Sequence, residues 1–237
     1  MSNRMLLSVL SSIVVGRIPR RVFVAALIMG LPGLGWAGTY SFFNTNSIPI
    51  NDLGTPPTMA ALYPSSITVD GLTGQTINHL SVTLYGFSHT FPSDVDIVLG
   101  GPSGELSMLM GEVGGSTKLP VSNLTLILDD SAANSLPLNS MLTSGTFKPT
   151  RGSATLSFEF PTPAPAGSSS ALAALSVFNG TDPNGNWNLF VVDESSPDAG
   201  TISLGWSMQV TTVPEPGPFG FAAVALSCIS IIRMWRR

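Results

Sequence analysis

The sequence has little charge, and positive charge is scarce outside its two ends. Charged residues make up 10% of the chain, whereas a globular chain typically has about 25%. Between Gly38 and Val213 there are three basic residues against thirteen acidic ones, so this stretch has a formal charge of −10. Because so acidic a surface repels phosphate backbones, the composition argues against nucleic-acid binding and favours solubility outside the cell and contact with divalent cations.

Cysteine and histidine are also scarce. The single cysteine, Cys228, lies in an apolar run, so no internal disulfide can form and the fold must rely on burial or metal. Only His79 and His89 could serve as a histidine base, and there is no Gly-x-Ser-x-Gly elbow. Since nucleophilic catalysis needs a nucleophile, a base and an orienting group, we expect no enzymatic activity; an uncharacterised hydrolase is the alternative.

Long helical periodicity is missing as well, and 24 glycines with 19 prolines favour short strands joined by turns. Apolar and polar residues alternate along Ile77–Tyr85 and Thr201–Val210, whereas Trp187–Val192 is apolar on both faces after Asn188 and should lie centrally. Shorter predicted strands are Ser66–Val69, Val95–Leu99, Leu106–Met110, Leu124–Leu128 and Ala154–Phe160.

About eight such strands, separated by Gly- and Pro-rich turns, predict an all-β, jelly-roll-like β-sandwich. We place this sandwich at 66–212, with Trp187 and Trp206 in its core. The preceding 38–65 segment is expected to be irregular, with at most an edge strand. The Pro-, Ala- and Ser-rich stretch Pro161–Ser170 predicts a long surface loop, with a domain boundary as the alternative.

The N-terminal region, 1–37, has the pattern of a cleavable secretory signal. Arginines precede the apolar run Val22–Leu31, and Gly35-Trp36-Ala37 supplies small residues around a spacer. The run is short for a membrane-spanning helix, so we predict cleavage after Ala37. A retained N-terminal anchor is the alternative.

The C-terminal region, 213–237, has three parts in order. Val213-Pro214-Glu215-Pro216 is followed by the uncharged run Gly217–Ile232 and then by a basic end with Arg233, Arg236 and Arg237. Sixteen helical residues span about 24 Å, and extension to Trp235 brings this near the ~30 Å of a bilayer core. We therefore predict a transmembrane helix whose arginines stay cytoplasmic.

This three-part tail resembles the PEP-CTERM sorting signal of Gram-negative bacteria. The resemblance implies recognition by an exosortase, a membrane transpeptidase that would cut near the Pro-Glu-Pro motif after export by the secretion machinery. It also implies an inner-membrane-anchored intermediate and then delivery to the cell surface or extracellular matrix. An ordinary single-pass anchor with a Pro-rich neck is the alternative.

The middle of the chain resembles the P domain, or Homo B domain, of proprotein convertases and bacterial subtilisin-like proteases. Two blocks carry the likeness, His79–Gly104 and Phe178–Trp206, the second with Gly185-x-Trp187 followed by Asp193 and Gly200. The resemblance implies a jelly-roll sandwich over about Ile67 to Thr212 and a structural role for His89. In that family the domain stabilises a preceding protease, for which the sequence between the signal and the first predicted strand leaves no room.

Five acidic residues near predicted strand ends are candidate calcium ligands: Asp94, Asp96, Asp193, Glu194 and Asp198. Calcium takes several oxygen ligands, commonly carboxylates and carbonyls, and neighbouring carboxylates repel unless they are solvated or metal-bound. Asp94 and Asp96 are two residues apart, so on a regular strand they share a side. Solvated turn aspartates are the alternative, and calcium is the only cofactor that the sequence suggests.

Together these features predict an exported surface or matrix protein that displays a non-catalytic interaction module to an unidentified protein or matrix partner. A secreted accessory subunit that stabilises a separately encoded protease is the alternative.

Overall fold

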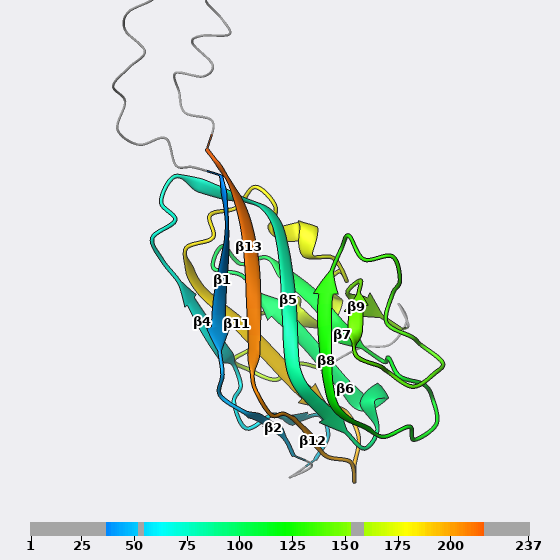
Figure 1. Ribbon diagram of the computed structural model, residues 1–237. Coiled ribbons are helices and arrows are strands. Elements are labelled where there is room, and N and C mark those ends of the chain that lie inside the picture. Colours follow the sequence, from blue (N-terminus) through cyan, green and yellow to red (C-terminus); the bar gives the residue numbers. More distant parts are fainter. Residues whose placement is uncertain (1–36, 52–54, 153–158, 216–237) are drawn as a thin grey trace, which may run out of the picture. The chain divides into compact units, whose positions relative to one another are not determined.

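The computed structural model describes residues 37–51, 55–152 and 159–215, which form two β-sheets packed face to face (Figure 1). The first sheet contains β1 (Gly38–Asn44), β2 (Ile48–Ile50), β5 (Gln75–His89), β8 (Val121–Asp129), β9 (Gly145–Phe147), β12 (Gly200–Ile202) and β13 (Trp206–Pro214). The second contains β3 (Thr58–Met59), β4 (Ser65–Val69), β6 (Val95–Gly100), β7 (Leu106–Gly111), β10 (Thr150–Arg151) and β11 (Gly185–Asp193).

The strand pairs are antiparallel except for β8 with β9 and β10 with β7, which are parallel. Three short 3-10 helices join the strands: η1 (Pro92–Asp94), η2 (Ser168–Ser170) and η3 (Leu175–Phe178). The predicted all-β sandwich is thus confirmed. The predicted signal and transmembrane helices lie outside the described residues, and within those residues no helix has the length and hydropathy to cross a membrane.

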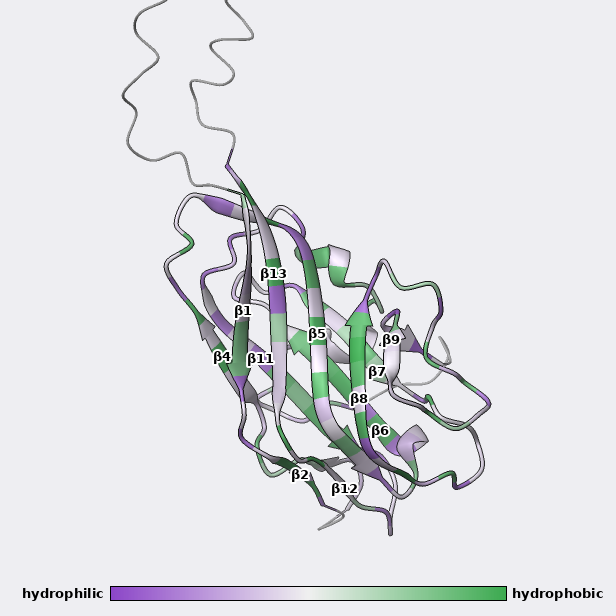
Figure 2. Ribbon diagram, viewed as in Figure 1, coloured by the Kyte–Doolittle hydropathy of each residue, from purple (hydrophilic) through white to green (hydrophobic). Residues whose placement is uncertain are grey.

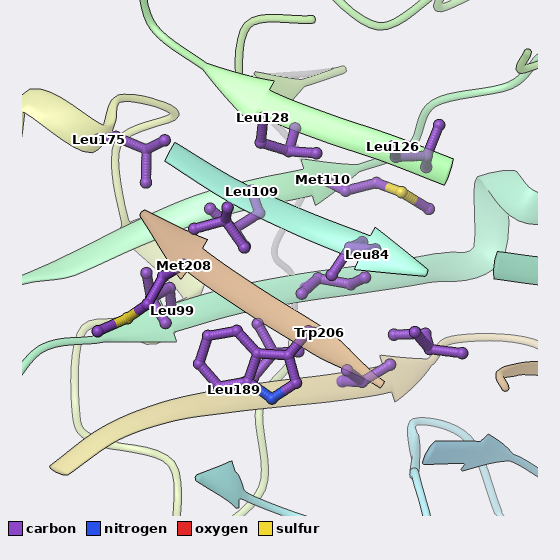
Figure 3. Packing of buried hydrophobic residues seen from close by; sticks show 14 of the residues in the cluster. Leu84, Leu99, Leu109, Met110, Leu126, Leu128, Leu175, Leu189, Trp206 and Met208 are labelled. Carbon is purple, nitrogen blue, oxygen red and sulfur yellow. The ribbon is translucent and has the colours of Figure 1, made fainter. Parts of the chain in front are cut away.

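The core lies between the sheets and receives side chains from both. Leu84 of β5 and Trp206 of β13 meet Leu99 of β6 and Leu189 of β11, as Figure 3 shows from close by. Hydrophobic residues dominate β6, β7 and β8 in Figure 2, consistent with strands that are covered on at least one face. The two tryptophans predicted for the core are there, with Trp187 fully buried and Trp206 1% exposed.

β11 is central, as its apolar faces predict. It pairs with β6 along one edge and with β4 and β3 along the other. Burying both faces of a strand requires apolar side chains in both directions, and the residues Trp187 to Val192 largely supply them.

The alternation along β5 holds from Leu80 to Leu84 but not at its start. Regular alternation would place Asn78 on the buried face with Leu80, whereas Asn78 is exposed and Ile77 is buried. The register with β13 shifts here, because Thr211 pairs with His79 and Thr212 pairs with Ile77. Asn78 is therefore the extra residue of a β-bulge, which reverses the face that each earlier residue presents.

The predicted strand Thr201–Val210 is two strands, β12 and β13, with a turn between them. Gly205 has φ +73°, a left-handed conformation that glycine adopts readily, and a side chain there would overlap Asn44 of β1. Unbroken alternation would place Leu204 on the buried face with Trp206, but Leu204 lies in the turn and is 62% exposed. Alternation predicts the two strands correctly but not the break.

The segment predicted to be irregular, 38–65, contributes β1, β2 and β3 to the sheets. β1 is an edge strand, as allowed by the prediction, and pairs with β13 from Gly38–Thr212 to Asn44–Trp206. The sandwich therefore starts at Gly38 rather than at residue 66. The strand signal of β1 is weak because Phe42 and Phe43 break the alternation of polar and aromatic residues, and no residue of β1 is fully buried.

The long loop predicted at Pro161–Ser170 is present, with η2 at its end. It leads into Leu172, whose carbonyl accepts a hydrogen bond from Met108 N at 2.9 Å. The predicted strand Ala154–Phe160 falls almost entirely on residues 153–158, outside the described part of the chain; Glu159 and Phe160 are not in a strand.

Candidate functional site

The candidate acidic residues gather at one end of the sandwich, where β5 and β11 end and β6 begins. Val95 pairs with Asp193 and Asp96 pairs with Val192. Val95, Ile97 and Leu99 point into the main core, whereas Val98 belongs to a separate cluster on the other face of the sheet. Since successive side chains alternate, Asp193 lies on the inner face and Asp96 on the outer face.

The inner cluster consists of Asp94, Asp193 and Asp198 with His89 and Lys118. Its centre is a buried pair in which His89 Nε2 lies 3.1 Å from Asp193 Oδ2, with both side chains fully buried. Phe91 N donates to His89 Nδ1 at 3.2 Å, so Nδ1 is the acceptor and Nε2 carries the proton donated to Asp193. Both ring nitrogens are engaged, which leaves neither for a substrate.

Gly200 makes this arrangement possible. It pairs with His89 across β12 and β5, and a side chain at Gly200 would overlap Ser88 O and the His89 ring. The Gly200 position is thus fixed by close packing against the buried histidine.

Asp198 is 4% exposed, and side chains from two other segments form an ion pair or a hydrogen bond with it. Lys118 Nζ lies 2.8 Å from Oδ2, and Thr90 Oγ1 donates to Oδ1 at 2.9 Å. Burial raises the pKa of Asp198, but the hydrogen bonds from Lys118 and Thr90 outweigh burial and hold the pKa below its usual range.

Asp94 links the inner cluster to the end of β11, because its carbonyl accepts a hydrogen bond from Glu194 N at 2.8 Å. Burial, followed by the charges of Asp193 and Asp198, raises the pKa of Asp94 to about 6, against the opposing effect of His89 and Lys118. Asp94 is thus the most weakly neutralised acid of the inner cluster.

The outer cluster consists of Asp96, Glu194 and Glu112, which comes directly after β7. Asp96 is 1% exposed, and its Oδ1 has no hydrogen-bond partner among the described residues. Burial, then the charge of Glu194 and a hydrogen bond with it, raise the pKa of Asp96 to about 9; the backbone amide of Glu112 opposes the rise. At neutral pH this carboxyl group is protonated unless a cation compensates its charge.

The five candidate ligands therefore divide between two surroundings. Asp94 and Asp96 do not share a side, because Asp94 ends η1 and the strand begins only at Val95. Asp193 and Asp198 belong with Asp94, whereas Glu194 belongs with Asp96. Among the described residues, no three His, Cys, Asp or Glu side chains already converge in metal-binding geometry.

Sequence reasoning missed Lys118, Thr90 and Glu112 as members of these clusters. Lys118 is one of only three basic residues between Gly38 and Val213. Because acidic residues far outnumber basic ones there, this scarcity was the one sequence feature that could have indicated an ion pair. Thr90 directly follows His89, whereas nothing in the sequence connects Glu112 to Asp96, since β6 and β7 meet only through sheet pairing.

His79 lies in a separate, more exposed pair. Its Nε2 is 3.0 Å from Asp129 Oδ1, and the His79 side chain is 38% exposed, consistent with the predicted polar face of β5. The hydroxyl of Ser131 also bonds to Asp129 Oδ1, so Ser131 and His79 share one acceptor. Nearby Asp130 accepts hydrogen bonds from Leu175 N and Ser176 N at the start of η3.

The start of β1 and the end of β13 lie at the opposite end of the sandwich from the acidic clusters (Figure 1). Gly38, directly after the predicted cleavage residue Ala37, pairs with Thr212, and Pro214 pairs with Gln75. Val213 and Pro214 are therefore the last residues of β13, and Glu215 N donates to Gly74 O at 3.0 Å. Pro216 and the arginines Arg233, Arg236 and Arg237 lie outside the described residues.

No family model and no curated protein matches the sequence. Two solved structures are similar: a serine protease of Aeromonas sobria, with 14% identity and a TM-score of 0.35 over 79% of this chain, and the complex of that protease with its chaperone, with 15% identity and a TM-score of 0.36 over 78%. The likeness covers 28% of the length of the matched chain in each case. At such identity and TM-score it carries no argument about activity.

Proposed function

We propose that this chain is an exported protein that displays a non-catalytic β-sandwich at the cell surface or in the extracellular matrix. The observation that carries the proposal is the sequence of the C-terminal tail, in which a Pro-Glu-Pro motif precedes an uncharged run and a basic end. Such a tail suits recognition by an exosortase-type transpeptidase, with the helix and arginines holding the intermediate in the inner membrane.

The position of the motif supports this proposal. Val213 and Pro214 end the last strand of the sandwich, so a cut near Pro216 would separate the folded domain from the membrane segment without removing a strand. Cleavage after Ala37 would leave Gly38, the first residue of β1, at the new N-terminus. Both proposed cuts thus leave the two sheets complete.

The geometry of the histidines supports a non-catalytic role. His89 is buried with both ring nitrogens in hydrogen bonds, and His79 is paired with Asp129. The acidic clusters lie at the end of the sandwich away from β1's start and β13's end, where a displayed domain would be free to meet a partner.

The intact mass of the protein recovered from the native cell surface tests the proposal. We expect a chain that begins near Gly38 and ends between Val213 and Pro216. A chain that still ends at Arg237 would mean that the tail is a permanent anchor and would overturn exosortase sorting. Recovery of a stoichiometric protease in the same preparation would instead support an accessory subunit and overturn the display role.

A further inference from the structure

Two carboxyl oxygens at the acidic end of the sandwich are buried without a hydrogen-bond partner among the described residues, Asp94 Oδ2 and Asp96 Oδ1, and Asp96 is the more deeply buried of the two residues. Asp96 is 1% exposed, and its Oδ1 has no hydrogen-bond partner among the described residues. A buried polar atom without a partner is costly, and an uncompensated buried charge is more so. Because Asp96 occupies a β6 position that an apolar residue could fill, a ligand for this oxygen would explain the carboxyl group.

The surroundings of Asp96 favour a cation as that ligand. The charges that act on it most strongly come from two further acids, Glu194 and Glu112. The inner cluster, by comparison, has Lys118 and His89 as partners for Asp198 and Asp193. Asp96 therefore lies among like charges, whereas Asp193 and Asp198 each lie beside a hydrogen-bonding partner.

The sheet topology brings the three outer acids together from distant parts of the sequence. β6 lies between β7 and β11, so Asp96 near the start of β6 lies between Glu112, after the end of β7, and Glu194, after the end of β11. Glu194 Oε1 accepts a hydrogen bond from Glu159 N at 3.0 Å, which places Glu159 beside this cluster. Carboxylates and backbone carbonyls at such strand ends are the oxygen ligands that calcium takes.

We infer that the outer cluster binds one calcium-class divalent cation, with Asp96 and Glu194 as its carboxylate ligands and Glu112 as an additional negative charge. The other ligands are backbone oxygens and water, since the described side chains do not supply a third ligand in place. Calcium fits better than magnesium because calcium accepts irregular oxygen shells, whereas magnesium keeps several waters that a nearly fully buried aspartate would have to accommodate.

The test measures binding of Ca²⁺ alone to the full-length chain after treatment with EDTA, by equilibrium dialysis with metal analysis and by isothermal titration. We expect one Ca²⁺ per chain. Asp96→Asn keeps the shape of the side chain and should weaken binding at least tenfold. Asp70→Asn is the matched control, because it removes the same charge from an exposed turn and should leave the affinity within twofold of the wild type.

Tryptophan fluorescence from the buried Trp187 and Trp206 verifies that each variant is folded. If Asp96→Asn does not fold, Glu194→Gln serves in its place, with the same loss expected. Undetectable binding at millimolar Ca²⁺, or equal affinity in wild type, Asp96→Asn and Glu194→Gln, would overturn the inference and leave a protonated carboxyl pair as the explanation. The surface display proposed above is unaffected by either outcome, because it is tested by the mass of the native chain.

Discussion

The inner and outer clusters lie at the same end of one sandwich and are both acidic, yet they differ in what surrounds their most buried carboxyl groups. Asp193 is fully buried and bonded to His89 Nε2, and Asp198 is 4% exposed and bonded to Lys118. Asp96 is as buried as either but has an unpartnered oxygen and acidic neighbours.

The difference shows that burial alone does not determine the state of a carboxyl group. In both clusters burial raises the pKa, but the partners decide the outcome: the pKa of Asp198 lies below the usual range and that of Asp96 is raised to about 9. Removing a partner should therefore destabilise the inner cluster, whereas adding a cation should stabilise the outer cluster.

The largest effect is expected from His89→Ala in the inner cluster. Loss of the imidazole leaves Asp193 buried without its main partner, which typically costs about 3–5 kcal/mol of the free energy of unfolding. His79→Ala is the matched control, because it breaks a His–Asp pair whose histidine is 38% exposed and should cost less than about 1 kcal/mol. Urea unfolding followed by tryptophan fluorescence measures both; similar costs would contradict the contrast between buried and exposed pairs.

Calcium should stabilise the protein through the outer cluster only. At a free Ca²⁺ concentration of about 100 times the Kd, mass action raises the free energy of unfolding by about 2.7 kcal/mol. Urea unfolding with Ca²⁺ or EDTA should show this increment in the wild type and in Asp198→Asn but not in Asp96→Asn. Loss of the increment in Asp198→Asn instead would assign the cation to the inner cluster.

Without calcium, the outer cluster should make stability fall as pH rises. Because the pKa of Asp96 is raised to about 9 in the folded state, native Asp96 keeps a proton that the unfolded chain has released between about pH 4 and 9. This gives a slope of at most about −1.4 kcal/mol per pH unit, which Asp96→Asn should remove.

Asp198 should act in the opposite direction, because its lowered pKa contributes stability that is lost as pH falls. The difference between the pH profiles of wild type and Asp96→Asn in EDTA, from pH 5 to 8, isolates the Asp96 slope. Parallel profiles would mean that Asp96 is ionised in the native state.

The smallest effect is expected from Lys118→Met. The Lys118 side chain is 58% exposed, whereas that of its partner Asp198 is 4% exposed, so the loss should cost about 1 kcal/mol. Lys148→Met removes an exposed lysine without a described carboxylate partner and should change stability by less than about 0.5 kcal/mol. Thermal unfolding at pH 7 compares the two; an equal change would mean that Lys118 does not neutralise Asp198.

Much of the fold could be predicted from local patterns. Alternation and the doubly apolar run at Trp187–Val192 predicted β5 and β11, and both tryptophans were expected in the core, because a strand reports its burial in the period of its side chains. The errors arose where local pattern is silent: the bulge at Asn78, the turn at Gly205, and β1, whose edge position leaves it half exposed.

The sequence could predict which acidic residues belong to the candidate site but not which of them lie together. The sequence identified acids near strand ends, and Asp193 and Asp198 do meet Asp94. It placed Asp94 and Asp96 together, however, because it could not detect that a 3-10 helix ends between them.

The sequence by itself determined the strand content, the acidity of the domain and the sequence motifs at the two ends of the chain, since each is a property of neighbouring residues. Only the tertiary structure decided that Glu112, Asp96 and Glu194 lie at the same end of three neighbouring strands, because strand pairing brings β7, β6 and β11 together. It also decided that Lys118 reaches Asp198, which is 80 positions away in the sequence. The charge of each carboxyl group depends on these distant partners, so it follows from the fold rather than from the local sequence.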